Sequence, residues 1–244
     1  MRFEKHPAPL GAPPGLAKKD ALLPLMNNLG QLAQRSAVIF SKTGTAIYHS
    51  HHDLIRFWER AVRRANLPVR LTQGFNPRPR LVFPHALGLG ISSLSEELDL
   101  EFHQPVELPV LESSLAGVML PGIGITGVVA LPLEGRGRQI KESRYRVTGW
   151  PAGSDLALAT AVRQLLDQAE ISVTRGAPGE ERRLDIRPFV SNLAVSGGEV
   201  GLVMTLRHQA GGSARPDELL ALLATTLGIN HHQLGVEKTW MRVE

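Results

Sequence analysis

Apolar side chains recur at helical spacing most clearly over residues 54–65. One face of a helix with 3.6 residues per turn would collect Leu54, Phe57, Trp58, Ala61, Val62 and Ala65. Ser50 and Asp53 have the spacing of a capping box, which predicts where this helix begins. Asn66 and Pro68 predict its end, because a proline cannot continue a helix.

Weaker patterns around this helix complete a βαββαβ order. Residues 98–102 alternate between apolar and polar, as a half-buried strand does. Residues 70–72 and 81–83 are extended on either side of a proline-rich loop. The remaining elements are a turn at 42–44, a weak helix over 110–119, and strands over 37–40, 46–48 and 123–131. This order of elements is that of a ferredoxin-like unit.

The same order recurs in outline after residue 143. Strands are predicted over 145–147, 171–174 and 236–243, a hairpin joins 184–193 to 200–206 across 196–198, and helices span 156–169 and 219–227. Pro216 suits the first position of the last helix, and Asp217 and Glu218 complement its dipole. No residue-level repeat is evident, so the duplication concerns topology alone.

We therefore predict an α+β protein built from two ferredoxin-like halves with antiparallel sheets. The first half spans residues 36–132, the second spans 143–244, and a linker over 133–142 joins them. Residues 1–35 form an extra N-terminal segment, which we expect to be disordered because its start is rich in Pro, Gly and Ala. A short helix within it, over 17–35, is weakened by a proline.

Composition narrows the class of protein. The chain has 244 residues, of which 43% are hydrophobic and 20% charged, as in ordinary globular proteins. The net charge of +4 permits an anionic partner without requiring one. The chain has no cysteine, which excludes disulfides, thiolate catalysis, Cys-ligated zinc and a Cys-held iron–sulfur cluster. No apolar run has the length of a membrane span and the start does not look like a secretory signal, so we expect a cytoplasmic protein.

Residues 73–80 read QGFNPRPR, which neither a helix nor a central strand accommodates. Each proline removes a backbone donor and biases its predecessor toward an extended conformation. We expect a stiff, ordered loop that holds five candidate ligand-binding side chains, Gln73, Phe75, Asn76, Arg78 and Arg80. The alternative is a plain connection between two strands.

Arginine dominates the predicted helix and the loop after it. The candidates are Arg56, Arg60, Arg63 and Arg64 on the helix and Arg70, Arg78 and Arg80 beyond it, with no lysine between Lys42 and Lys141. Guanidinium groups bind phosphate through a planar fork, and an aromatic ring such as Phe75 stacks on bases. One interpretation is an anionic or RNA ligand. The other is a solvated helix face, with Glu59 offsetting part of the charge.

His51 and Asp53 are the catalytic candidates, with Ser50 beside them. Histidine has a pKa suited to proton transfer. The alternative is structural, because Ser50 and Asp53 also form a helix cap, which contributes about 1 kcal/mol. No HxxxH or HExxH spacing occurs, so neither a metal site nor a cofactor is predicted.

Ser93, Glu96, Glu97 and Asp99 form an acidic group. Paired carboxylates can act as acid and base, but we favour ion pairs with the arginines, with Glu96 and Asp99 as supporting carboxylates. The loop at 211–215 could receive a phosphate at the helix start that follows it. Two acids in that first turn would repel it, so we favour a plain helix start.

The order of several short motifs resembles the radical-SAM-linked family of unknown function. The motifs are FSKTG, SHHDL, ERAVRRANLP, QGFNPRPRLVF, LGLGISSLSEELDLEF, DIRPFV and GSARPDELL. The resemblance covers about residues 37–243. Members of that family occur alone or as the C-terminal part of a larger radical-SAM protein.

The resemblance places the family's motif residues on this chain. They fall on Ser50, His51, Asp53, Glu59, Arg60, Arg63, Arg64, residues 73–77, Ser93, Glu96, Asp99 and residues 215–218. Two positions depart, with His52 in place of the usual Leu and Arg78 in place of a usual His. If that His transfers a proton in the family, this member lacks the chemistry.

The resemblance implies association with a radical-SAM enzyme on another chain that acts on RNA. The absence of cysteine fits an accessory role, because the cluster must then be held by the partner. We predict a module without catalytic activity of its own that docks the enzyme or presents its substrate through the Arg-rich helix and the 73–80 loop.

Two alternatives stay open. One is an RNA-processing or RNA-modifying enzyme that uses His51 as general acid or base. The other is a small-molecule site in the groove between the halves. All of these hypotheses rest on the expectation that the 73–80 loop lies beside the start of the helix, so that His51, Phe75 and the arginines share one wall.

Overall fold

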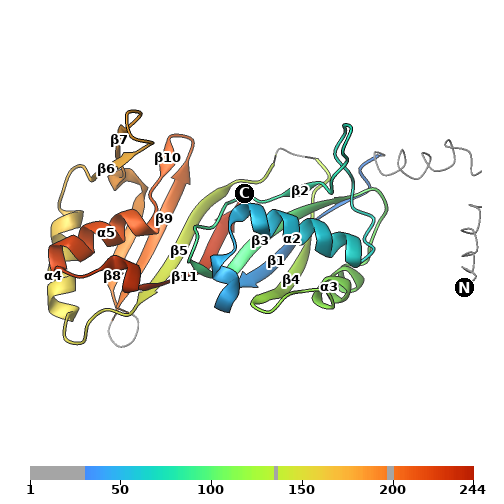
Figure 1. Ribbon diagram of the computed structural model, residues 1–244. Coiled ribbons are helices and arrows are strands. Elements are labelled where there is room, and N and C mark those ends of the chain that lie inside the picture. Colours follow the sequence, from blue (N-terminus) through green and yellow to red (C-terminus); the bar gives the residue numbers. More distant parts are fainter. Residues whose placement is uncertain (1–30, 135–136, 197–200) are drawn as a thin grey trace, which may run out of the picture.

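The computed structural model describes residues 31–134, 137–196 and 201–244. Its main feature is one long sheet (Figure 1). The strands of this sheet are β1 (Gln34–Lys42), β2 (Leu81–Val82), β3 (Ser92–Phe102), β4 (Ile123–Leu131), β5 (Ile140–Thr148), β8 (Val190–Val195), β9 (Leu202–Gln209), β10 (Gly212–Ser213) and β11 (Gly235–Val243). Their order is β10-β9-β5-β11-β3-β1-β4, with β2 beside β3 and β8 beside β9.

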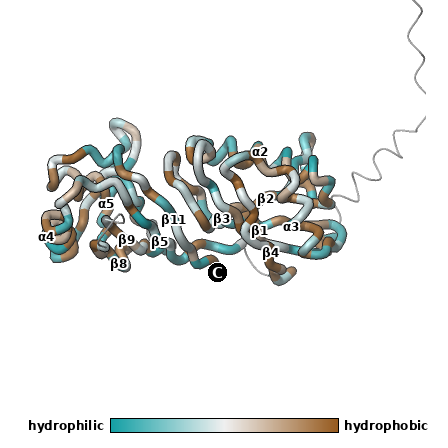
Figure 2. The backbone as a smooth tube through the Cα atoms, turned by 90° about the horizontal axis from the view of Figure 1, so that it is seen from below, coloured by the Kyte–Doolittle hydropathy of each residue, from teal (hydrophilic) through white to brown (hydrophobic). Residues whose placement is uncertain are grey.

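The α-helices lie on one side of this sheet (Figure 2). In the described parts of the chain they are α2 (His51–Arg64), α3 (Leu108–Ala116), α4 (Asp155–Leu166) and α5 (Pro216–Leu227). Short 3-10 turns are η1 (Gly44–Tyr48), η2 (Arg187–Phe189) and η3 (His231–Gln233), and a separate hairpin joins β6 (Ser172–Arg175) to β7 (Arg182–Asp185). None of the helices in the described residues is both long and apolar enough to span a membrane.

The predicted α+β class with a mostly antiparallel sheet is confirmed. In the first half, α2 and α3 connect strands paired in the order β2-β3-β1-β4. In the second half, α4 and α5 connect strands paired in the order β8-β9-β5-β11. Among the described strands, all pairings are antiparallel except that of β11 with β3.

α2 forms as its sequence predicts. The Ser50 hydroxyl accepts a hydrogen bond from the Asp53 N–H at 3.2 Å, and the Asp53 carboxylate accepts one from the Ser50 N–H at 3.1 Å. This capping box satisfies backbone donors that a helix start leaves free. Leu54, Phe57 and Trp58 on α2 are buried against the sheet. The helix ends where Asn66 adopts a left-handed conformation, with φ of 51°.

The two halves share a sheet but keep separate cores. One core packs β1 and β3 against α2 and α3, and the other packs β5, β8 and β9 against α4 and α5. A short parallel pairing joins them, with Glu237 opposite Ser92 and Lys238 opposite Ser93. The loop between β2 and β3 also crosses over, because Leu87 and Ile91 are buried in the core of the second half.

Three sequence predictions about secondary structure are wrong. Residues 46–48 form part of η1, not a strand, because the chain turns at Gly44 with φ of 55°. The strand predicted over 184–193 is divided between β7, η2 and β8, since Pro188 falls in the middle of it. The helix predicted to end at residue 35 does not reach that far, because Gln34 already begins β1. The rest of the N-terminal segment to residue 30, the linker residues 135–136 and the turn residues 197–198 lie outside the described residues.

Candidate functional site

The polar side of α2 presents arginines to solvent. Arg56, Arg60 and Arg63 recur at helical spacing opposite the buried side, and Arg64 lies next to them. All four are exposed, and none forms an ion pair with another residue that the structure describes. We call these four residues the Arg face.

The QGFNPRPR segment is the tip of a hairpin. Leu71 bridges Pro79, and the Thr72 N–H donates to the Arg78 carbonyl at 2.8 Å. Gly74 has φ of 135°, a backbone conformation that glycine adopts freely and that strains other residues. Phe75 is fully exposed at the tip, and Gln73 and Asn76 are exposed beside it. The segment is thus an ordered loop with an exposed aromatic ring at its tip.

The hairpin returns along α2 toward the start of the helix. The Arg78 guanidinium lies 3.8 Å from the Glu59 carboxylate, near the middle of α2. Further along, the ring of Phe83 packs edge-on against His51, with centroids 5.3 Å apart. Eight helical residues span about 12 Å, so the tip lies toward the end of α2 and away from His51 (Figure 1). The expected wall shared by His51 and Phe75 is therefore wrong, whereas Arg78 and α2 do come together.

The acidic residues of β3 do not serve the Arg face. Glu97 and Asp99 bind Arg138, from the segment between the halves, with 2.6 Å between the Glu97 and Arg138 groups. Glu101 is the carboxylate that pairs with Arg70 at 2.9 Å and Arg80 at 3.1 Å. The predicted ion pairs of Glu96 and Asp99 with the arginines of α2 and the hairpin are wrong. Asp99 faces away from α2, because side chains alternate along a strand, and Glu96 pairs with Lys238.

Glu96 faces the helices and belongs to a buried polar cluster. Its carboxylate lies 2.5 Å from the Lys238 ammonium, and both side chains are almost completely buried. Lys42 is also buried, and its ammonium donates to the main-chain carbonyls of Ile47 at 3.3 Å and His49 at 2.9 Å. Ser93, predicted beside Glu96, is buried opposite Lys238. We call Lys42, Ser93, Glu96 and Lys238 the seam cluster, because it lies where the two halves join.

Histidines extend the seam cluster on both sides. His51, at the first turn of α2, feels the charges of Glu96 and Lys42. His85, in the loop between β2 and β3, packs its ring against His208 of β9 with centroids 4.9 Å apart. The hydroxyl of Ser143, which is completely buried, lies 2.8 Å from Nε2 of His208. Polar groups from seven segments thus converge at one seam: β1, β3, β5, β9, β11, α2 and the loop between β2 and β3.

Burial and the neighbouring lysines keep these imidazoles neutral. Burial, reinforced by the positive charge of Lys238, lowers the pKa of His85 to about 3 and that of His208 to about 4. Burial also lowers the pKa of His51, which His52 lowers further and Glu96 opposes. The pKa of Lys42 is lowered by burial, and Glu96 opposes that shift.

A cavity of about 680 Å³ opens beside the histidines, between the halves. Its walls come from the loop between β2 and β3, from β5 and β9, and from the start of α5 together with η3. Polar groups reach it from His85, Tyr145, His208, Arg215 and Asp217. Its size is that of ordinary small-molecule sites.

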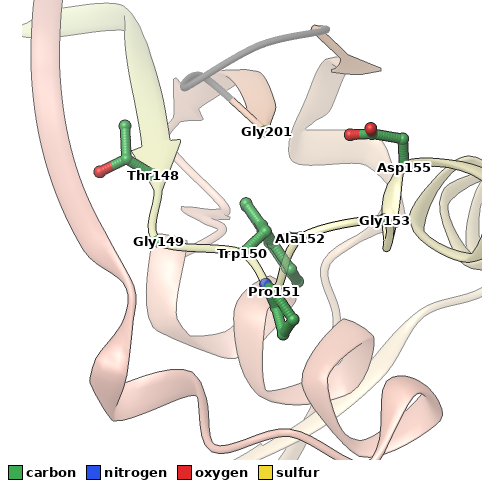
Figure 3. Close-up of a pocket in the computed structure, with 8 residues that line it drawn as sticks. All are labelled: Thr148, Gly149, Trp150, Pro151, Ala152, Gly153, Asp155 and Gly201. Atoms are coloured by element: carbon green, nitrogen blue, oxygen red, sulfur yellow. The ribbon is translucent and has the colours of Figure 1, made fainter.

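A second hollow, of about 450 Å³, lies around Trp150 (Figure 3). The Thr148 hydroxyl and the Asp155 carboxylate lie on opposite sides of Trp150. Trp150 itself is pressed against Gly201, where a Cβ atom would stand 2.0 Å from the indole ring. The polar groups do not converge, so this hollow shows no arrangement for catalysis.

The motif residues of the second half bind one another and the backbone, as residues with a structural role do. Arg175 donates to both oxygens of the Glu218 carboxylate, at 2.6 and 2.7 Å, and Glu218 accepts from the Arg215 N–H at 2.9 Å. Asp185 accepts from the N–H groups of Ile171 and Arg187, each at 2.9 Å. These bonds fix the start of α5 and the turn after β7.

Comparison with protein families gives one match. A model described as an uncharacterized protein conserved in bacteria (DUF2344) matches residues 35–216, which is more than half of the chain. The chain belongs to the DUF2344 family. The matched region contains the Arg face, the hairpin, Glu96 and His208. Of the residues central to the seam, Lys238 lies beyond it.

Other comparisons add little to the DUF2344 assignment. No curated protein matches the chain. Among solved structures, an unknown protein from Galdieria sulphuraria aligns at 15% identity, over 84% of this chain and 96% of that one, with a TM-score of 0.26. A score this low does not establish a common fold.

Sequence reasoning missed Lys42, Lys238, His85 and His208. The alternation of side chains along a strand could have revealed Lys42. Every second residue of a strand points to the same face, and Lys42 is two and four residues after the buried Phe40 and Val38. Lys238 likewise points to the same face of its strand as Val236, two residues before it. A lysine at an inward-facing strand position is unusual, since lysine is rarely buried without a partner.

Proposed function

We propose that this protein is a binding module that holds an RNA or another polyanion against the Arg face and the tip of the hairpin. The observation that carries the proposal is that four adjacent guanidinium groups are exposed without a carboxylate partner among the described residues. Fully exposed Phe75 offers a stacking surface toward the same end of α2. Gln73, Asn76 and Arg78 add polar contacts from the hairpin.

The architecture supports this use of the surface. We infer that each half is a ferredoxin-like unit, since the pairing orders β2-β3-β1-β4 and β8-β9-β5-β11 correspond to one another. A continuous sheet with helices on one side makes α2 a rigid support for its outer side chains. A rigid support limits the entropy lost when a long charged side chain is held on a ligand.

A triple variant tests the module. Arg56→Ala/Arg60→Ala/Arg63→Ala should weaken binding of single-stranded RNA and reduce the slope of log affinity against log salt by about 2, as expected for three lost phosphate contacts. Fluorescence anisotropy over a salt series measures both. Arg163→Ala/Arg182→Ala/Arg207→Ala is the control, because these exposed arginines of the second half give the same change in net charge. Equal losses in both variants, or no salt-dependent binding by the unmodified protein, would reject the module.

The proposal includes a radical-SAM enzyme on another chain as the partner. It is supported by the motif resemblance and by the lack of cysteine in a chain that would otherwise need a cluster of its own. The module would present RNA to that enzyme in the cytoplasm. When a tagged chain is purified from its native cell, an iron–sulfur protein with S-adenosylmethionine-dependent activity should co-purify with it. If repeated purifications contain no such protein, the proposed partner is wrong.

An RNA-processing enzyme is the second candidate, and the environment of His51 favours it. This imidazole is half-buried against Phe83, burial lowers its pKa, and it feels the charge of Glu96. A neutral imidazole can accept a proton near pH 7. If the chain cleaves RNA, His51→Gln should lower turnover by about 100-fold or more while leaving affinity unchanged. Gel-based cleavage assays with His49→Gln as the control measure this, and full activity of His51→Gln would exclude it.

A further inference from the structure

The cavity between the halves is lined by side chains that can donate hydrogen bonds to an anion. Four imidazoles and one guanidinium line it, from His85, His208, His231, His232 and Arg215, against the single carboxylate of Asp217. Behind His85 and His208 lies the buried ammonium of Lys238, whose positive charge both rings feel. Lys238 is itself paired with Glu96 and Arg215 is offset by Asp217, so this end of the cavity offers an anion N–H donors and not a net charge.

Apolar side chains make up much of the rest of the lining. Leu87 and Ile91 come from the loop between β2 and β3, Leu220 comes from α5, and Leu234 and Val236 come from the segment that leads into β11 and begins it. Leu87, Ile91 and Leu220 are themselves buried, so they are held in place by the core of the second half. A preformed, largely apolar lining with a few fixed polar groups is the usual construction of a small-molecule site.

The buried polar groups behind the cavity are costly to the fold. Lys238 and Ser143 are completely buried, and Glu96 is nearly so. A buried ion pair is often no more stabilising than apolar side chains of the same size. A seam that only joined two halves would gain by being apolar, whereas a binding site needs polar groups that hold its donors in place, as Ser143 holds His208.

We propose that this cavity binds a small organic anion, with its phosphate or carboxylate group at His85 and His208 and its apolar or aromatic body against Leu87, Leu220 and Leu234. The neutral imidazoles donate their N–H groups to the anion. Arg215 and Asp217 lie at the rim of the cavity, where Arg215 attracts the anion and Asp217 repels it. The site is separate from the Arg face and does not depend on RNA binding.

The experiment compares three ring compounds that differ in charge. Phenyl phosphate and benzoate represent the two anionic groups, and phenol is their neutral counterpart. Isothermal titration calorimetry with the full-length protein should give saturable binding of phenyl phosphate or benzoate, and weaker or no binding of phenol. Which of the two anions binds more tightly identifies the anionic group. If neither anion binds better than phenol, the proposal is wrong.

Two exposed rim residues allow a test that does not disturb the core. Arg215→Gln should weaken binding of the anion, and Asp217→Asn should strengthen it, each by about threefold to tenfold. Arg163→Gln and Asp155→Asn are the matched controls, because Arg163 is an exposed arginine and Asp155 occupies the first turn of α4 as Asp217 does that of α5. His208→Asn should abolish the preference for anions over phenol. Rim variants that behave like their controls would place the ligand elsewhere and overturn the assignment.

Discussion

Lys238→Met is expected to lower the free energy of unfolding by about 3–5 kcal/mol, because it leaves the carboxylate of Glu96 buried without its partner. The two groups are 2.5 Å apart, and neither side chain is accessible to water to any useful extent. Lys42 is another cation that interacts with Glu96, but its ammonium is already engaged with the carbonyls of Ile47 and His49. Urea denaturation followed by circular dichroism measures the loss.

The double variant Lys238→Met/Glu96→Leu separates a buried charge from a lost contact. It should recover most of the stability, because no uncompensated charge remains and apolar side chains fill the seam. Arg146→Met is the control, since Arg146 of β5 pairs with Glu237 of β11, next to Lys238 but on the outside of the sheet. An exposed pair is worth only about 0–1 kcal/mol. A small loss in Lys238→Met, similar to that of Arg146→Met, would mean that water reaches Glu96 and that the seam is not dry.

Acid is expected to destabilise the protein well before its carboxylates titrate. The pKa values of His85 and His208 in the folded protein are about 3 and about 4, against about 6.5 in an unfolded chain. Between these values the unfolded chain binds more protons, so the free energy of unfolding rises with pH. The contribution of both histidines is therefore complete above about pH 6.5 and is lost as the pH falls toward 4 and then 3.

The groups that face these rings set the size of the effect. His85 faces Lys238, His208 and His51, and His208 faces Lys238 and Ser143, so protonation would add positive charge beside a buried ammonium. Urea denaturation at pH 7 and pH 5 should show a loss of several kcal/mol, reduced to a small remainder in His85→Asn/His208→Asn. His231→Asn/His232→Asn is the control, since these histidines lie at the outer part of the cavity. An unchanged difference between pH 7 and pH 5 in the first variant would contradict the assignment.

The Arg face illustrates how far local pattern predicts a surface. Helical spacing alone separates Arg56, Arg60 and Arg63 from the buried side of α2, and the capping box fixes where the helix begins. The hairpin was also predictable as an ordered loop, because its prolines and Gly74 restrict the backbone locally. What the pattern did not determine is the direction of the hairpin, which carries Phe75 away from His51.

Glu96 and Asp99 show where prediction from sequence stops. Their spacing in β3 places them on opposite sides of a strand, but their partners are Lys238 and Arg138, which are distant in sequence. The seam cluster arises because β11 pairs with β3 in parallel, a register that no residue near Glu96 specifies. The same pairing brings His85 and His208 together from different halves.

The sequence by itself determined the α+β class, the helices with their caps, the strands with clear alternation and the exposed arginines, because each depends on neighbours within a few turns of the chain. Only the tertiary structure decided which charges are buried, which carboxylate meets which cation, and that a cavity opens at the seam. Those features depend on contacts between segments that are far apart in sequence. The energy of a buried charge is set by these distant partners, and not by the residues beside it in the chain.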